Sequence, residues 1–210
     1  MLFQVITKDL KANILPMSIV TLLLACLIPI LFNLTPSSIP QAAMPGELFV
    51  PLIAIICLPT IFLPDQAEAI QAVINAKRYR LSLLRTLRVV WFILILSMLN
   101  AGIVVAYAVH GAEVPMLAVL VDFVAKVLLL AGIVAASYRV TQNIVVAYII
   151  PVTYFALCLG YTGLGPFNLL TLMHGRSLAD CWWQIGFALL LLVIGLMPSD
   201  SKVALNSIHD

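Results

Sequence analysis

Charged residues are scarce in this sequence. Only 10% of its 210 residues are Asp, Glu, Lys or Arg, whereas 63% are hydrophobic and the mean hydropathy is +1.14. A typical soluble domain is about 25% charged and about 45–50% apolar. A chain of this composition lacks the polar surface that keeps a protein in water, so the sequence excludes a soluble domain and predicts a membrane protein. It also has no basic arm or tail for a phosphate backbone, and we expect no nucleic-acid partner.

Catalytic and metal-binding motifs are absent as well. No GxxxxGK[ST] phosphate loop, GxSxG nucleophile motif or HExxH metal motif occurs. The four cysteines form no CxxC or Cys/His cluster, and we expect them to pack as small buried side chains. The histidines fall in predicted loops or the tail: His110, His174 and His209. We therefore expect no enzyme activity, no metal and no cofactor in this chain.

Long apolar runs are what the sequence has instead. A helix needs about 20 mostly apolar residues to cross a bilayer. Six runs approach this length: Leu15–Leu34, Leu48–Pro64, Val89–Val109, Val114–Ser137, Ile144–Gly163 and Trp182–Met197. We predict an all-α membrane protein with six transmembrane helices, built as a single domain over residues 1–210.

The positions of lysine and arginine predict the orientation. If the N-terminus is inside, only Arg176 falls in an outer segment. Nine fall in inner segments: Lys8, Lys11, Lys77, Arg78, Arg80, Arg85, Arg88, Arg139 and Lys202. Positive residues gather on the cytoplasmic side of membrane proteins. We expect both termini in the cytoplasm, in a multi-pass protein of the cell membrane.

Two inner segments carry patterns of their own. Residues 1–13 are typical of an amphipathic helix lying at the membrane surface, because one helical face gathers Leu2, Phe3, Ile6 and Leu10. Residues 65–88 form the longest inner loop. Within it, Gln66–Ala76 contains no Gly or Pro and is rich in helix formers, and a basic cluster follows at 77–80. The pattern predicts a cytoplasmic helix directly after the second span.

The outer segment 164–181 is the third such region. Gly165, Pro166 and Gly175 interrupt it, and two stretches have a helical pattern, Phe167–Met173 and Ser177–Trp183. We predict two short re-entrant helices near the outer interface between spans five and six. Trp182 and Trp183 follow, and such aromatic residues often anchor a span at the interface.

Asp122 and Lys126 are charged residues inside the fourth run. A charge near the bilayer centre costs at least about 2.5–3.5 kcal/mol. The i,i+4 spacing places both groups on one helical face, and we predict an ion pair that faces other helices or a water-filled cavity. Asn100, near the middle of the third run, is a candidate hydrogen-bond partner of this pair. The cluster fits either a transport pathway or a structural pair that holds the bundle.

The order of these elements resembles that of the ABC-2 type permeases, the membrane subunits of ABC transporters. The resemblance rests on the architecture and on about twenty residues: Pro64-Asp65-Gln66-Ala67-Glu68, then Ala69–Ala76, then Lys77-Arg78-Tyr79-Arg80-Leu81-Ser82-Leu83-Leu84-Arg85. Glu68 aligns best with the acidic residue that follows span two in that family.

The resemblance implies a function and two partners. A separate cytoplasmic ATPase, which holds the ATP and Mg²⁺, would dock on a coupling helix in the loop 65–88. A second permease subunit, identical or related, would complete the pathway. Export of a peptide, drug or lipid-like substrate is usual in that family. The residues implied for ATPase coupling are Gln66, Glu68, Ile70, Ile74, Lys77, Arg78 and Arg80.

Two other functions stay open. Substrate-binding subunits of vitamin importers also have about six spans. They usually carry an AxxxA pattern in the first span, whereas Leu15–Leu34 contains a single alanine, Ala25. A non-transporting scaffold or immunity protein is the second alternative, because hydropathy alone does not separate it from a transporter.

Overall fold

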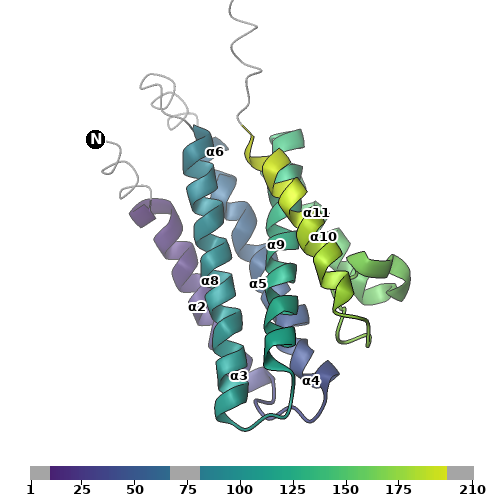
Figure 1. The fold of residues 1–210 in the computed structure, drawn as a ribbon. Coiled ribbons are helices and arrows are strands. Elements are labelled where there is room, and N and C mark those ends of the chain that lie inside the picture. Colours follow the sequence, from purple (N-terminus) through teal and green to yellow (C-terminus); the bar gives the residue numbers. More distant parts are fainter. Residues whose placement is uncertain (1–9, 67–80, 198–210) are drawn as a thin grey trace, which may run out of the picture.

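The described part of the chain is a bundle of helices. The computed structural model describes residues 10–66 and 81–197, and these ranges contain no β-strand. Figure 1 shows the helices running roughly along a common axis. Their bounds are η1 (Leu10–Ile14), α2 (Leu15–Ala25), α3 (Ile28–Leu31), α4 (Ile39–Met44), η2 (Pro45–Phe49), α5 (Val50–Cys57), η3 (Leu58–Phe62), α6 (Leu63–Gln66), α8 (Leu81–Val109), α9 (Met116–Thr141), α10 (Ile144–Gly160), η4 (Thr162–Phe167) and α11 (Ala179–Leu196).

Several helical stretches are long and apolar enough to cross a membrane. Five meet this description among the described residues: Lys11–Leu31, Ile39–Gln66, Ser82–Val109, Met116–Thr141 and Ala179–Leu196. They make the chain a multi-pass, α-helical membrane protein. The fifth predicted span corresponds to α10, a shorter apolar helix of 17 residues. The count of six spans therefore stays a prediction.

The second span is longer and more irregular than the sequence suggests. It begins at Ile39 rather than Leu48, so most of the predicted outer segment before Leu48 is helical. Five consecutive elements form it, including a π-helical turn (η2) and a 3₁₀ turn (η3). A proline stands in the first turn of α4, where the missing N–H has no partner within the helix to lose, and the proline of α5 follows directly after the π-helical turn. The second span is thus one continuous helix with irregular turns.

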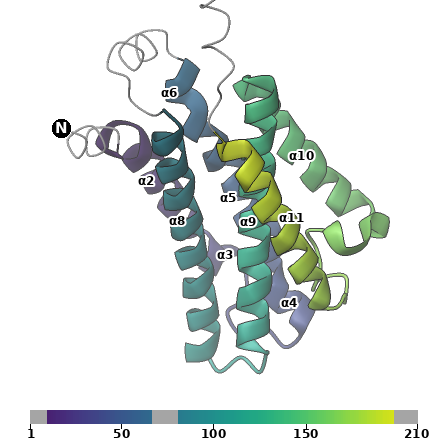
Figure 2. The same ribbon diagram turned by 45° about the horizontal axis from the view of Figure 1, so that its top comes forward.

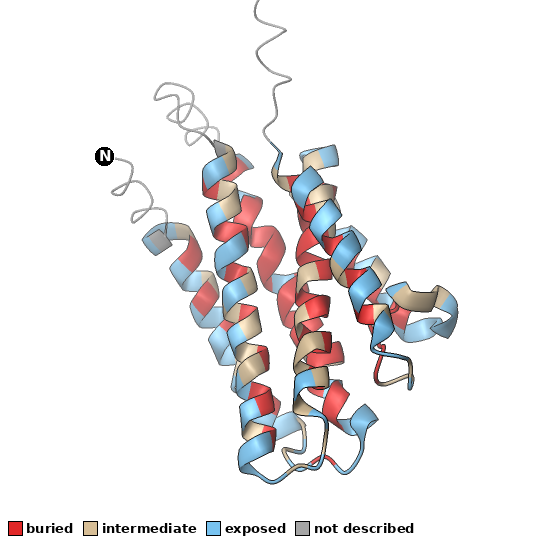
Figure 3. Cartoon of the chain, in the orientation of Figure 1, coloured by how far each residue is buried: buried red, intermediate tan, exposed pale blue. Residues whose placement is uncertain are grey.

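α9 and the Ile39–Gln66 span form the centre of the bundle. Figure 3 shows buried residues concentrated on α5 and α9, with α2, α8 and α11 exposing much of their surface. In the most apolar stretch of each span, 72% of the residues of Ile39–Gln66 and 61% of those of α9 are buried, against 22% for α11. Side chains on these two central spans are therefore the ones shielded from lipid.

Small residues allow α9 and α11 to pack closely. A Cβ added to Gly195 would lie 2.6 Å from the Ala135 Cβ, and one added to Gly132 would lie 2.9 Å from the Ala188 carbonyl oxygen. Glycine and alanine at such positions let membrane helices approach through their backbones. This contact fixes α11 against the face of α9 that carries Asp122 and Lys126.

α8 includes residues 81–88, which agrees with the helical entry into the third span that the loop 65–88 is predicted to contain. α6 reaches Gln66, the last described residue before the loop. Residues 67–80 lie outside the described ranges, as do 1–9, so the predicted coupling helix and most of the amphipathic helix at 1–13 are not described. At the other end, a short loop connects α8 to α9. It contains Gly111, whose φ of 73° suits glycine.

The segment between α10 and α11 departs from the prediction. It contains one 3₁₀ helix, η4, but no second helix over 167–173. Asn168 has an extended backbone (φ −70°, ψ 129°), and hydrogen-bonded turns follow it up to residue 176. Figures 1 and 2 both show this segment at the side of the bundle, away from the end where α11 finishes.

The ends of the helices sort into two groups. Figure 1 shows that the start of η1, the end of α6, the start of α8 and the end of α9 lie at one end of the bundle. These segments carry Lys11, Arg85, Arg88 and Arg139, and we call this the basic end. Arg176 belongs to the segment before α11, away from that end. The described basic residues of the predicted inner segments thus lie at the same end of the bundle. That this end faces the cytoplasm stays a prediction.

Candidate functional site

Three charged side chains meet inside the bundle. Glu47 comes from η2, and Asp122 and Lys126 come from α9; all three are fully buried. We call them the carboxylate cluster. Charged residues within membrane spans are rare and usually functional, which makes this cluster the candidate site.

The predicted ion pair between Asp122 and Lys126 is present. The Lys126 Nζ donates a hydrogen bond of 2.7 Å to the Asp122 Oδ1. One turn of α9 separates the two residues, so the helix itself sets their distance.

The Lys126 ammonium group has a full set of acceptors. Besides Asp122, it donates to the Thr171 Oγ1 at 2.6 Å and to the Gln184 Oε1 at 2.7 Å. A lysine ammonium has three N–H donors. All three are therefore used, and Lys126 ties α9 to both α11 and the segment before it.

Gln184 fixes that segment onto α11. Its amide Nε2 donates to the carbonyl oxygens of Pro166 at 2.8 Å and Asn168 at 2.9 Å. Asn168 in turn accepts from the Leu170 N–H at 2.8 Å and donates to the Tyr161 carbonyl at 3.1 Å. The turns at 168–173 are thus held by side chains in place of a regular helix.

Glu47 binds the same segment from the opposite side. Its two carboxyl oxygens accept backbone N–H groups, from Leu172 at 2.7 Å and from Met173 at 2.9 Å. Next to Glu47, η2 packs directly against α9, because Gly46 lies against the ring of Phe123, the neighbour of Asp122. Glu47 therefore joins the second span, the turns at 168–173 and α9 in one polar junction.

Gly46 makes this approach possible. A Cβ at this position would lie 2.1 Å from the Phe123 ring. A side chain at this position would have to displace either the Phe123 ring or η2 itself. The π-helical turn at Pro45–Phe49 places both residues in this contact, and such turns are frequent at functional sites.

Asn100 does not join the cluster. It is fully buried, but neither its Oδ1 nor its Nδ2 has a hydrogen-bond partner among the described residues. The expected hydrogen bond to Asp122 or Lys126 is absent, and the two other donors of Lys126 go to Thr171 and Gln184. The Asp122 Oδ1 accepts a second hydrogen bond from the Cys181 thiol at 3.2 Å instead.

A second buried charge group lies at the basic end. The Arg85 Nε donates to the Asp65 Oδ2 at 2.5 Å, and the Arg88 Nη1 donates to the Asp65 Oδ1 at 3.3 Å and to the Ile61 carbonyl at 2.9 Å. Arg88 is only 2% exposed. We call Asp65, Arg85 and Arg88 the arginine clamp. It fastens the end of α6 to the start of α8, on either side of residues 67–80.

An aromatic stack extends the clamp to α9. The rings of Phe62 and Tyr138 lie 4.1 Å apart and nearly parallel, and the Arg85 guanidinium lies 5.4 Å from the Tyr138 ring centroid. Three helical segments therefore meet around one acid.

The residues implied for ATPase coupling are mostly not described. Gln66 is exposed at the end of α6. The others lie outside the described residues: Glu68, Ile70, Ile74, Lys77, Arg78 and Arg80. Among described residues, Asp65 is the acid that pairs with basic side chains after the second span.

The cysteines are less uniform than predicted. Cys57, Cys158 and Cys181 are buried, whereas Cys26 is exposed on the bundle surface. Cys181 acts as a hydrogen-bond donor to the cluster, which composition alone does not reveal. Within residues 10–66 and 81–197, no group of three His, Cys, Asp or Glu side chains is placed to hold a metal ion.

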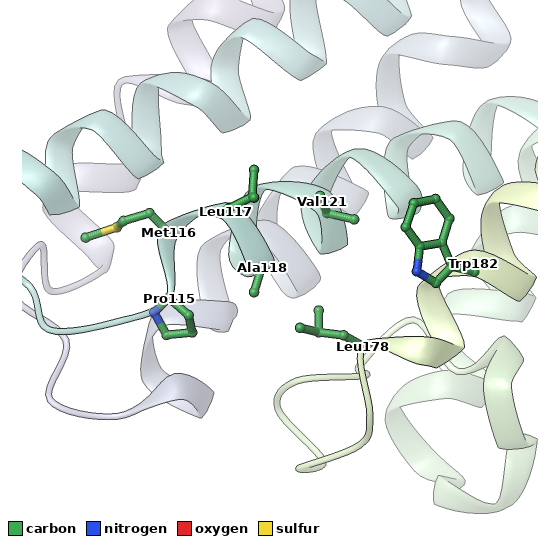
Figure 4. Close-up of a pocket in the computed structure, with 7 residues that line it drawn as sticks. All are labelled: Pro115, Met116, Leu117, Ala118, Val121, Leu178 and Trp182. Atoms are coloured by element: carbon green, nitrogen blue, oxygen red, sulfur yellow. The ribbon is translucent and has the colours of Figure 1, made fainter.

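An apolar groove opens between the first turns of α9 and the start of α11. Figure 4 shows Trp182 and Leu178 on one side and α9 side chains on the other. Its volume is about 490 Å³, and the lining residues are Pro115, Met116, Leu117, Ala118, Val121, Leu178 and Trp182. Trp182 has the only polar side-chain atom among these seven, so the groove offers little to orient a polar ligand.

Comparison with known proteins adds no relative. No protein-family model matches the chain, and neither does any curated protein or solved structure. The argument for function therefore rests on the residues and their geometry.

Sequence reasoning found the α9 pair and missed its partners. Glu47 was assigned to an outer loop because the second span was predicted to begin after it. Gln184 and Thr171 carry no signal of their own, since single polar residues are common near the ends of spans. The isolated acid in the apolar stretch Pro45–Phe49 was the one available signal.

Proposed function

We propose that this chain is the transmembrane permease subunit of an ABC transporter, coupled to a separate cytoplasmic ATPase. The observation that carries the proposal is the arginine clamp. It fastens both ends of residues 67–80 to the bundle through buried ion pairs around Asp65. A force that a partner applies to residues 67–80 would therefore act on α6 and α8, the helices at both ends of this segment.

A continuous helical route joins residues 67–80 to the carboxylate cluster. The Ile39–Gln66 span contains Glu47 and ends at the clamp, and it has the largest buried share among the five candidate spans. α8 and α9 meet the same clamp through Arg88 and Tyr138. A displacement of residues 67–80 would therefore reach the polar junction around Glu47 and the turns at 168–173.

The irregular form of this span supports such a movement. Its π-helical and 3₁₀ turns interrupt the regular α-helical hydrogen bonds. Kinks and bends of membrane helices concentrate at prolines and π-turns. The span can thus bend between the clamp and the cluster, as a transport cycle requires.

The remaining parts of the proposal follow from the resemblance. The basic end would face the cytoplasm of a cell whose membrane holds this protein. The ATPase would contact Gln66, Glu68, Ile70, Ile74, Lys77, Arg78 and Arg80, and would hold the ATP and Mg²⁺. A second permease subunit would complete the pathway, and the cargo would be a peptide, drug or lipid-like molecule moved outward.

Copurification tests this proposal directly. The tagged chain is isolated from its native membrane in mild detergent, beside a variant with Lys77, Arg78 and Arg80 changed to Glu. We expect an ATPase with a Walker motif to accompany the native chain and to be lost from the variant. Lys11→Glu, an exposed charge at the same end, is the matched control and should retain the ATPase.

The outcomes test both the transporter function and the site of contact with the ATPase. An ATPase retained by the triple variant would place the contact elsewhere than the basic cluster. No ATPase with the native chain, under conditions that keep membrane complexes intact, would reject the transporter. Because charge reversal can also invert a membrane protein, the orientation of each variant is checked with a reporter fused after Asp210, which we expect in the cytoplasm.

A further inference from the structure

One acceptor in the carboxylate cluster has no donor. The Asp122 Oδ2 is buried and accepts no hydrogen bond from any described residue. The donors that bind the cluster are all engaged elsewhere. Lys126 uses its three N–H groups, the Cys181 thiol donates to the Oδ1, and the Leu172 and Met173 N–H groups donate to Glu47. A buried carboxylate oxygen left without a donor is costly, and such an atom requires an explanation.

The charges of the cluster do not balance either. With both acids ionised, two carboxylates face one ammonium group, and the site would carry a net charge of −1 in the middle of the bundle. An uncompensated charge in such surroundings costs several kcal/mol. The arginine clamp lies at the basic end with Asp65 and supplies no cation here.

We propose that Glu47 and Asp122 form a binding site for a single proton, held between the Glu47 carboxyl and the Asp122 Oδ2. One proton removes both problems at once. It gives the Asp122 Oδ2 a hydrogen-bond donor, and it brings the cluster to zero net charge. Glu47 and Asp122 are the sequence neighbours of Gly46 and Phe123, whose close contact brings the two fully buried acids to the same junction. Paired carboxyl groups that share a proton are an established arrangement in proteins.

The other titratable groups around the site leave this conclusion unchanged. From α9 the cation is Lys126, and from α11 the thiol is Cys181, whose hydrogen bond goes to the Asp122 Oδ1. From α10, Cys158 accepts the Leu169 N–H behind the turns, and from α8, Tyr107 donates to the Ala42 carbonyl. His174 follows Met173 in the same turns, and its buried Nδ1 has no partner among the described residues.

The position of this proton gives it a structural role. Glu47 holds the turns at 168–173 through two backbone hydrogen bonds, and Asp122 holds Lys126, which binds Thr171 in those turns. Loss of the proton sets two carboxylates against each other across this junction. The bound proton therefore keeps the second span, α9 and the segment before α11 together. This inference does not depend on the proposed ABC function.

Infrared spectroscopy of the purified full chain tests the site. A protonated carboxyl group absorbs in its own C=O stretching region, separate from ionised carboxylates, and shifts on transfer to D₂O. We expect one such band at neutral pH in the native protein. Glu47→Gln and Asp122→Asn each leave one acid beside Lys126, so the band should disappear in both. Asp180→Asn, in the partly exposed pair with Arg176, should leave it unchanged.

Absence of the band from the native protein at neutral pH overturns the proposal, whatever the variants do. Its persistence at full intensity in both Glu47→Gln and Asp122→Asn also overturns it. If one variant fails to fold, the other still decides, since either replacement removes the need for the proton.

The pH dependence of unfolding in detergent is a second measurement. The folded protein holds a proton that the unfolded chain releases at neutral pH, so unfolding releases one proton and stability falls as pH rises. The native unfolding equilibrium constant should increase about tenfold per pH unit from this site. Glu47→Gln should lose this dependence, and an unchanged slope in the variant would contradict the shared proton.

Discussion

The arginine clamp and the carboxylate cluster are both buried charge groups, but their compositions are opposite. The clamp sets two arginines around one acid, and the cluster sets two acids around one lysine. In the clamp, both oxygens of Asp65 accept hydrogen bonds, whereas the Asp122 Oδ2 in the cluster accepts none from a described residue. A planar guanidinium fits a carboxylate in a fixed geometry, while a lysine supplies only a point charge. The clamp is therefore suited to hold, and the cluster to change its protonation.

The two groups also differ in how far apart their members lie in the sequence. Asp65 and Arg88 flank one loop, whereas the cluster brings Glu47 together with Gln184 and the turns at 168–173. The clamp can form once α6 and α8 meet. The cluster requires the whole bundle, so a defect in any of four segments should reach it. Substitutions in and around the two groups are therefore expected to differ in how much stability they cost, and Lys126 to differ most from a surface charge.

Lys126→Met should have the largest effect. It removes the only cation of the cluster together with three hydrogen bonds, and leaves two carboxyl groups facing each other. Breaking a buried ion pair in this way costs about 3–5 kcal/mol. The free energy of unfolding in mixed detergent micelles measures the loss. Lys11→Met removes an exposed lysine and should be close to neutral; equal losses in both variants would show that Lys126 is not held as described.

Asp65→Asn should come second. The amide leaves Arg85 and Arg88 without their acid, but Arg85 is 13% exposed and the Ile61 carbonyl still accepts from Arg88. We expect a loss of about 1.5–3 kcal/mol, the range for hydrogen bonds to charged groups. The same unfolding assay applies, with Gln66→Ala as the exposed neighbour. A loss greater than that of Lys126→Met would reverse the order argued here.

Gly46→Ala tests the close approach of η2 to α9. The new methyl group would overlap the Phe123 ring, and overpacking of this kind costs about 1–3 kcal/mol. Glu47 should also move away from Asp122, so the infrared band of the shared proton should weaken. Gly102→Ala is the control, because nothing lies within 4 Å of a Cβ there. A Gly46→Ala protein with native stability and an intact band would contradict the contact.

Asp180→Asn should have the smallest effect. It removes a partly exposed i,i+4 pair with Arg176 at 3.2 Å. Exposed ion pairs contribute about 0.2–1 kcal/mol. The unfolding assay should therefore barely separate this variant from the native chain. A loss above 1 kcal/mol would mean that the segment before α11 depends on its surface charges as well as on Glu47 and Gln184.

The sequence predicted those features that depend on local spacing. The Asp122–Lys126 pair follows from an i,i+4 pattern on one helix, and the apolar runs follow from composition. Glu47, Thr171 and Gln184 could not be assigned in the same way, because their partners are set by how α9, α11 and η2 pack. Asn100 illustrates the same limit, since the middle of one span need not face the middle of the next.

The second span begins at Ile39, earlier than the predicted Leu48, and its sequence explains the difference. Prolines and a glycine before Leu48 are typical of a loop, and in most helices they would end one. Here the prolines fall in first turns, and Gly46 is required by Phe123. Tertiary packing thus overrides the local signal, and the segment that sequence patterns describe least well is the one that carries Glu47.

The unequal lengths of α8 and α10 have a consequence for the surrounding lipid. α8 has 29 residues and is about 43 Å long, whereas α10 has 17 and is about 26 Å long. The hydrocarbon core of a bilayer is about 30 Å thick. If α10 crosses the bilayer, as the sequence predicts, the lipid beside it must thin or the helix must shift, while α8 tilts or extends into the headgroups. The protein would then present a thick and a thin side to its membrane, with the segment between α10 and α11 on the thin side. Acyl-chain length would then be a property of the bilayer that acts on this segment.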